Sequence, residues 1–103
     1  MEQYTLTQKK KSCIVTFSGN FTAGLVPDLK KALLKTVAAG VIDLEFNLEE
    51  TKFIDSNGIG LLVAASNSMA QKKGEMKVIL KSDEVARLFQ NMRLMDRLGV
   101  VKR

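Results

Sequence analysis

Two apolar repeats of different period follow one another in the middle of this chain, and they constrain its fold more than any other feature. Apolar residues first recur every four positions, at Leu25, Leu29, Leu33 and Val37. This spacing predicts an amphipathic helix over about residues 26–38, with Ala32 and Leu34 widening its apolar face. Apolar and polar residues then alternate from residue 42 to residue 48, which predicts a strand covered on one face. A helix that leads at once into such a strand is typical of an α/β domain.

The rest of the chain continues this alternation of strands and helices. The expected strands cover residues 4–7, 13–18, 76–80 and 98–101, and the expected helices run from about 58 to 73 and from Ser82 or Asp83 onward. With no linker or repeat in its 103 residues, the chain is expected to form one domain over residues 1–103. The order ββαβαβαβ predicts an α/β fold with a mixed sheet and helices packed mainly on one face.

The same patterns predict which side chains form the core. Cys13, Val15 and Phe17 share one face of a strand, so Cys13 is expected to be a small core residue and not a reactive thiol. Phe46 and Phe53 are likewise expected at core strand positions. The two later helices are expected to bury Gly58, Leu61, Leu62, Ala65 and Met69, and Val85, Leu88, Phe89 and Met92.

The composition excludes several classes of function. The chain has no histidine and a single cysteine, which removes ordinary zinc sites and every Ser-His or Cys-His catalytic pair. No glycine motif that would cradle a nucleotide phosphate is present, so neither a cofactor nor a metal is expected. An enzyme would have to work with carboxylates and lysines alone, and we therefore expect no catalytic activity.

The expected location is the cytoplasm. The longest nearly apolar run, Gly58 to Ala65, is far shorter than the ~20 residues needed to cross a bilayer, so no membrane insertion is expected. The first residues lack a basic segment followed by an apolar core and therefore do not resemble a secretory signal. The lone Cys13 cannot form an internal disulfide, which fits a reducing compartment.

The net charge of +5 raises the question of nucleic-acid binding. The basic residues are scattered, with short clusters at Lys9–Lys11 and Lys72–Lys73 in predicted turns or helix ends. No aromatic residues that could stack on bases lie between them. We therefore expect no direct contact with nucleic acid, while weak attraction to an acidic protein partner stays open.

A serine at the junction of an apolar strand and an apolar helix is the main candidate for a functional residue. Ser56 is flanked by Asp55 and Asn57, and Gly58 and Gly60 leave little side-chain bulk beside it. Without a histidine, Ser56 is poorly equipped to act as a nucleophile but well placed to be modified. The alternative from the residues alone is that Ser56 caps the helix. Each glycine costs up to ~1 kcal/mol in a helix, so close approach by another group is a reasonable explanation for both.

The order and spacing of several short motifs resemble a STAS domain of the anti-sigma factor antagonist type over nearly the whole chain. The matching motifs are Phe46-Asn-Leu-Glu49 followed after three residues by Phe53-Ile-Asp-Ser-Asn-Gly-Ile-Gly60, Gly19 after the second strand, Gly74-x-Met76-x-Val78 and Val85-x-x-Leu88-Phe89.

This resemblance implies a mechanism and a set of partners. Family members bind a serine kinase that otherwise sequesters a sigma factor, and phosphorylation of a serine directly after the motif aspartate ends the binding. A metal-dependent serine phosphatase resets the cycle. The resemblance implies that Ser56 is the phosphorylated residue, and that Asp55, Asn57, Gly58 and Gly60 form the contact surface around it.

The chain departs from the family pattern at two positions of this surface. Thr22 stands where antagonists carry an aspartate after the second strand, in a region that contacts the kinase or its nucleotide. Asn57 replaces the usual serine or threonine. The family's C-terminal helix is not expected, because the sequence given stops at Arg103 after the predicted last strand.

Three alternatives to a phosphorylation switch remain. The chain could be a non-switching STAS subunit of a large sensory assembly or of a lipid-transport ATPase, in which case it would co-purify with other subunits independently of Ser56. It could also be a small-ligand module, or an enzyme. The sequence supports these two classes least, since it contains no phosphate-cradling loop and no catalytic pair.

Overall fold

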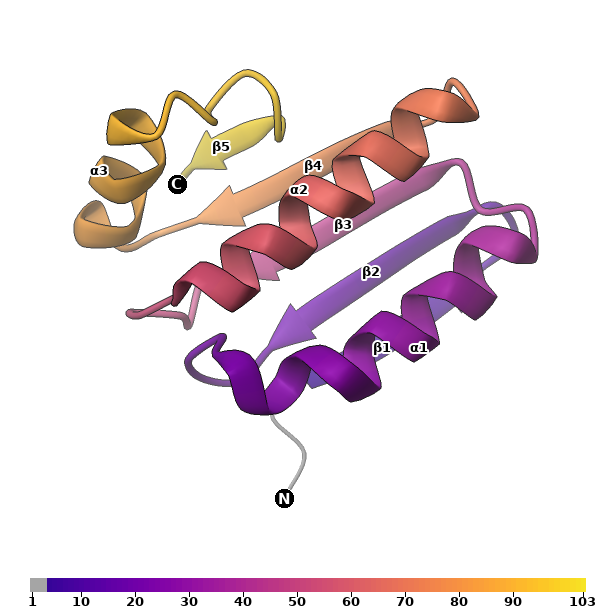
Figure 1. The fold of residues 1–103 in the computed structure, drawn as a ribbon, viewed down its shortest axis with the longest axis horizontal. Coiled ribbons are helices and arrows are strands. Elements are labelled where there is room, and N and C mark those ends of the chain that lie inside the picture. Colours follow the sequence, from indigo (N-terminus) through magenta and orange to yellow (C-terminus); the bar gives the residue numbers. More distant parts are fainter. Residues whose placement is uncertain (1–3) are drawn as a thin grey trace.

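A computed structural model describes residues 4–103 of the chain. Residues 1–3 lie outside the described residues, and the expectation that the N-terminus is not a secretory signal concerns them in part. Strands and helices alternate along the described chain (Figure 1). The elements in order are β1 (Tyr4–Lys9), β2 (Ser12–Phe17), the short 3₁₀ helix η1 (Ala23–Leu25), α1 (Val26–Ala38), β3 (Asp43–Leu48), α2 (Ser56–Gln71), β4 (Glu75–Leu80), α3 (Asp83–Asn91) and β5 (Val100–Lys102).

The five strands form a single mixed sheet in the order β1-β2-β3-β4-β5. The β1–β2 pair is antiparallel, and the three remaining pairs are parallel. Figure 1 shows α1 and α2 lying side by side across one face of the sheet, with α3 beyond the end of β4. The predicted α/β class, the element order and the mixed sheet are therefore confirmed.

The core lies between the sheet and the two long helices. Val15, Phe46 and Val78 are register partners on three neighbouring strands, and all three are fully buried. Cys13 shares their side of the sheet and is 1% exposed, as expected for a small core residue. The outward-facing residues of β3 are Asp43, Glu45 and Asn47, and α1 and α2 lie on the opposite side of the sheet from them (Figure 1).

Helix α1 follows the predicted pattern with one exception. Pro27 lies in its first turn, where its missing N–H is not needed, and Leu29 and Leu33 are buried. Gly40 follows the helix with φ of +101°, a conformation that favours glycine. The predicted widening of the apolar face is wrong at Leu34, which is 61% exposed because α2 does not reach over it.

Three further core predictions are wrong. Phe53 is 55% exposed and lies in the loop before α2, not in a strand. Ile42 precedes β3 and is 39% exposed, and Met92 follows α3 and is 47% exposed. At Ile42 and Met92 the apolar pattern runs past the end of its element, where the side chain leaves the covered face.

The helix ends explain two other sequence features. Ser82 caps α3 by accepting a hydrogen bond from the Val85 N–H, so the serine and not Asp83 is the cap. After α2 the left-handed position is Lys73, with φ of +58°, and not Gly74. Gly74 is needed for another reason, since an added Cβ would lie 2.7 Å from the Ile42 carbonyl oxygen.

Candidate functional site

The carboxyl ends of β2, β3 and β4 meet at one edge of the sheet, because these strands are parallel. The segments that follow them lead into η1 and α1, α2 and α3, so three helical N-termini lie along this edge (Figure 1). In open α/β sheets this edge is where binding sites usually form. The predicted site residues lie in the first two of these segments.

Ser56 is the first residue of α2, and it is exposed. The residue that caps the helix is Asp55, which has extended backbone geometry and accepts a hydrogen bond at Oδ1 from the Gly58 N–H, 2.9 Å away. Because Asp55 performs the capping, the Ser56 hydroxyl is not the group that starts the helix. The alternative that Ser56 caps the helix is therefore wrong, because the cap is Asp55.

Asp55 also joins two segments that are distant in sequence. Its second oxygen, Oδ2, accepts a hydrogen bond from the Ala23 N–H at 2.9 Å. The hydrogen bond from Gly58 is the largest of the effects that lower the pKa of Asp55, with further contributions from the amides of Ala23 and Asn57. The carboxylate is therefore held ionised and fixes η1 against the start of α2.

A short backbone bridge supports the same junction. Phe21 pairs with Ile54 as an isolated parallel bridge. The Phe21 N–H donates to the Phe53 carbonyl at 3.1 Å, and the Asp55 N–H donates to the Phe21 carbonyl at 3.2 Å. Phe21 and Ile54 are buried, so the bridge anchors Asp55 and the start of α2 to two core residues.

The two glycines of the motif have different roles. Gly58 is buried, and an added Cβ would lie 2.9 Å from the Phe21 carbonyl oxygen and 2.9 Å from Ile54 Cγ1. The close approach expected at Gly58 is therefore made by the protein's own backbone. Gly60 is exposed, and an added Cβ would have no heavy atom within 4 Å. Gly60 thus leaves an open surface one helical turn beyond Ser56.

The remaining predicted site residues lie around this junction. Asn57 is exposed in the first turn of α2, and Thr22 is half-buried directly before η1. Thr22 adjoins Ala23, whose N–H binds Asp55, so the position that departs from the family pattern borders the capped junction. The structure therefore brings Thr22, Asp55, Ser56, Asn57, Gly58 and Gly60 together at one end of the sheet.

Two residues of this junction were not recognised in their true roles from the sequence. Phe21 was not predicted as a core residue, although it is fully buried with its ring centroid 4.4 Å from that of Phe17. Phe53 was predicted to be buried and instead offers an exposed aromatic side chain three residues before Ser56. Both aromatics flank polar loop residues, and no local pattern distinguishes the covered ring from the exposed one.

The site presents an exposed hydroxyl, that of Ser56, at the start of α2. Within residues 4–103, no group of three or more His, Cys, Asp or Glu side chains is arranged to hold a metal ion. None of the helices in this part of the chain combines the length and the apolar character that crossing a bilayer requires. The exposed Ser56 lies at a helix N-terminus, where backbone N–H groups and the helix dipole favour negative charge.

Comparison with known sequences agrees with the motif. The sequence profile of the STAS domain matches residues 3–102. An anti-sigma-B factor antagonist of Staphylococcus aureus (strain NCTC 8325 / PS 47) is 31% identical over 94 residues, which cover 91% of this chain and 87% of that protein. The anti-sigma-B factor antagonist of Listeria monocytogenes is 34% identical over 80 residues, covering 77% of this chain and 69% of that protein.

Solved structures share the fold at lower sequence identity. A putative anti-sigma factor antagonist from Thermotoga maritima superposes with a TM-score of 0.85 at 17% identity, covering 97% of this chain and 86% of that one. The Bacillus cell fate determinant SpoIIAA in its phosphorylated form gives a TM-score of 0.80 at 17% identity, covering 97% and 90%. Because the STAS profile matches residues 3–102 and the Staphylococcus aureus antagonist is 31% identical, the chain belongs to the STAS domain family and is a relative of anti-sigma factor antagonists.

Proposed function

We propose that this protein is a phosphorylation-switched regulator that acts by binding other proteins and has no catalytic activity of its own. In its unmodified form it binds a serine kinase that is also an anti-sigma factor, and this binding releases the sigma factor. Phosphorylation of Ser56 by the kinase ends the binding, and a serine phosphatase restores it. The contact surface comprises Ser56 with Asn57, Gly60, Thr22 and Asp55, while Gly58 shapes it through the backbone.

The observation that carries this proposal is that Asp55, and not Ser56, caps α2. Asp55 caps α2 and binds Ala23, so the fold does not depend on the Ser56 hydroxyl. Ser56 is exposed at the protein edge where the helical N-termini gather. A hydroxyl that is exposed and not needed for capping can be esterified without dismantling the helix start.

Phosphate at this position would change the surface far more than the fold. It would add nearly two negative charges and three acceptor oxygens at the N-terminus of α2, where the helix dipole favours negative charge. A docked partner would have to bury these charges, at a cost of several kcal/mol unless it pairs them. The existence of SpoIIAA in a phosphorylated form shows for that protein that the shared fold tolerates the modification.

Phe53 adds a feature that suits a protein partner. Its 55% exposed ring lies in the loop that leads into Ser56. Aromatic residues are enriched in protein–protein interfaces, where they fill pockets on the partner. An aromatic anchor beside a modifiable hydroxyl would bring the kinase and its substrate residue together.

The test is phosphorylation by a serine kinase encoded in the same genome as this chain. After incubation with kinase and ATP, mass spectrometry of the digested protein should place one phosphate on Ser56. Ser56→Ala should remain unmodified, and Ser12→Ala is the matched control because Ser12 is also exposed but lies at the start of β2. Phosphate on another residue, with Ser56 unmodified, would contradict the proposal. If the protein co-purifies with other subunits and Ser56→Asp does not change this, the protein is instead a non-switching subunit of a larger assembly.

A further inference from the structure

Helix α2 is free of charged residues over its whole length. None of the 16 residues from Ser56 to Gln71 is Asp, Glu, Lys or Arg, although 26% of the chain is charged. This is not because the helix is buried, since about half of it faces solvent. The exposed residues are Ser56, Asn57, Gly60, Ala64, Asn67, Ser68, Ala70 and Gln71. Depletion of charge on an exposed surface is typical of the centre of a protein–protein interface.

An apolar groove lies between this face of α2 and helix α1. The groove has a volume of about 340 Å³ and is lined on the α1 side by Leu33, Leu34 and Val37 and on the α2 side by Ala64 and Ala65. Leu34 is 61% exposed, which makes it the most exposed of the large apolar side chains in the described chain. An apolar side chain from another molecule could therefore lie between the two helices and cover Leu34.

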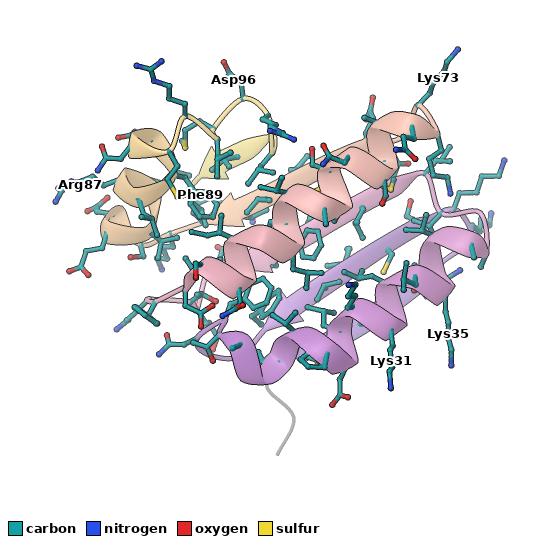
Figure 2. The ribbon with its side chains drawn as sticks, viewed as in Figure 1. Lys31, Lys35, Lys73, Arg87, Phe89 and Asp96 are labelled. Carbon is teal, nitrogen blue, oxygen red and sulfur yellow. The ribbon has the colours of Figure 1, made fainter. Side chains whose placement is uncertain are left out.

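The rims of this groove carry positive charge. Lys30 lines the groove itself. Lys31 and Lys35 point away from α2 (Figure 2), so they add positive charge to α1 without lining the groove. At the end of α2, the Lys72 Nζ donates a hydrogen bond at 2.8 Å to the carbonyl of Val37, one of the residues that line the groove. An apolar centre between basic rims is complementary to an apolar ridge bordered by carboxylates.

We propose that the α1–α2 groove is a docking surface for an acidic amphipathic helix of the protein partner. Resting on the proposed function, this extends the partner's contact area from Ser56 along α2. Residues four apart on a helix lie on one face, so Ser56, Gly60 and Ala64 connect the modifiable hydroxyl with the groove. Apolar side chains of the partner helix contact Leu34 and Ala64, and its Asp or Glu side chains pair with Lys30 and Lys72.

A second copy of this chain is a poorer occupant. A symmetric dimer through this face would bring Lys30 and Lys72 of both copies into one interface, and like charges in an interface oppose association. Helix α1 carries Lys30, Lys31 and Lys35 against a single acidic residue, Asp28, so it offers little internal compensation. The rims therefore select an acidic partner.

The first arm of the test uses a probe that does not depend on the kinase. The probe is a helical peptide as long as α2, with leucines along one face and glutamates on its flanks. Titration into the labelled protein should shift the NMR signals of Leu34, Ala64 and Ser68, and a peptide with lysine in place of glutamate should bind at least about tenfold more weakly. Leu34→Glu should abolish the shifts, while Ile14→Glu, at a 41% exposed position in β2, should leave them unchanged.

Several results of this arm would overturn the proposal. These are the absence of shifts at the groove, equal binding of the basic peptide, and equal loss in Leu34→Glu and Ile14→Glu. Sedimentation that shows a dimer abolished by Leu34→Glu would instead identify a second copy as the occupant. Binding to vesicles of anionic lipid that requires Leu34 would identify a membrane surface, and would also overturn the proposal.

The second arm separates this inference from the proposed function. The affinity of the kinase is measured for the parent protein, Leu34→Glu and Ile14→Glu. If the kinase binds the parent and Ile14→Glu but binds Leu34→Glu at least about tenfold more weakly, both proposals are supported. If it binds all three equally, the kinase remains the proposed partner, and the groove is not part of the interface, which overturns this inference. If it does not bind the parent, the proposed partner is wrong, and the peptide arm alone decides about the groove.

Discussion

The two glycines of α2 should respond in opposite ways to the same substitution. Gly58→Ala places a Cβ 2.9 Å from the Phe21 carbonyl oxygen, a backbone atom that is held by its hydrogen bond with the Asp55 N–H. Overpacking of this kind costs about 1–3 kcal/mol. Replacing glycine with alanine inside a helix contributes up to ~1 kcal/mol in the other direction. The expected net change for Gly58→Ala is a loss of up to about 2 kcal/mol of unfolding free energy.

Gly60→Ala is the matched control, because it adds the same methyl group to the same helix in open space. It should stabilise the protein by about 0.5–1 kcal/mol through helix propensity alone. The two variants should therefore differ by about 1–3 kcal/mol, the cost of overpacking, which corresponds to at least about 4 °C in melting temperature for a domain of this size.

The assay is urea unfolding followed by circular dichroism, with the free energy of unfolding obtained by linear extrapolation. Equal slopes in the parent and both variants would show that the comparison concerns the folded state. If Gly58→Ala stabilises the protein as much as Gly60→Ala, the contact between α2 and the Phe21 backbone does not constrain the junction. The conclusion that the Phe21–Ile54 bridge anchors the start of α2 would then be wrong.

Three other residues give separate predictions. Because hydrogen bonds hold the pKa of Asp55 below its usual range, its stabilising effect is present above that range and disappears as the pH falls through the lowered value. Asp55→Asn should thus be less stable than the parent at pH 7, and acid titration of the melting temperature should show the difference shrinking. Burial raises the pKa of the Cys13 thiol, so a thiol reagent should label it only after unfolding. Cys13→Val should cost less than about 1.5 kcal/mol by urea unfolding and leave partner binding unchanged. Thr22→Asp should speed phosphorylation of Ser56 by the kinase, measured as initial rate; an unchanged rate would show that the missing carboxylate is irrelevant.

Local sequence patterns predicted the elements well because each period reports directly on one covered face. The four-residue repeat placed α1, and the alternation at residues 42–48 placed β3. The patterns failed where burial depends on a distant segment. Phe21 is buried and Phe53 exposed because the two segments bridge across 32 residues of sequence, a contact that no local period contains. Leu34 is exposed because the spacing of α1 and α2 leaves a groove above it.

The candidate site was located by its motif, but its internal organisation could not be read from the sequence. Asp55, Ser56 and Asn57 are all residue types that can cap a helix, so the sequence alone left the cap open. The structure assigns the cap to Asp55 through its bond with the Gly58 N–H. The long-range bond from Ala23 to Asp55 was not predictable either, because it depends on where η1 packs.

The most direct test of the switch is the affinity of the kinase for the protein with and without phosphate on Ser56. If the phosphate must be buried unpaired, a cost of about 3 kcal/mol corresponds to a loss of affinity of at least about a hundredfold. The melting temperature should change little, because the cap on α2 is made by Asp55. Isothermal titration of the kinase with both forms measures this ratio. Equal affinity of the phosphorylated and unmodified forms would contradict the account, and a hundredfold difference in a folded protein is the result it predicts.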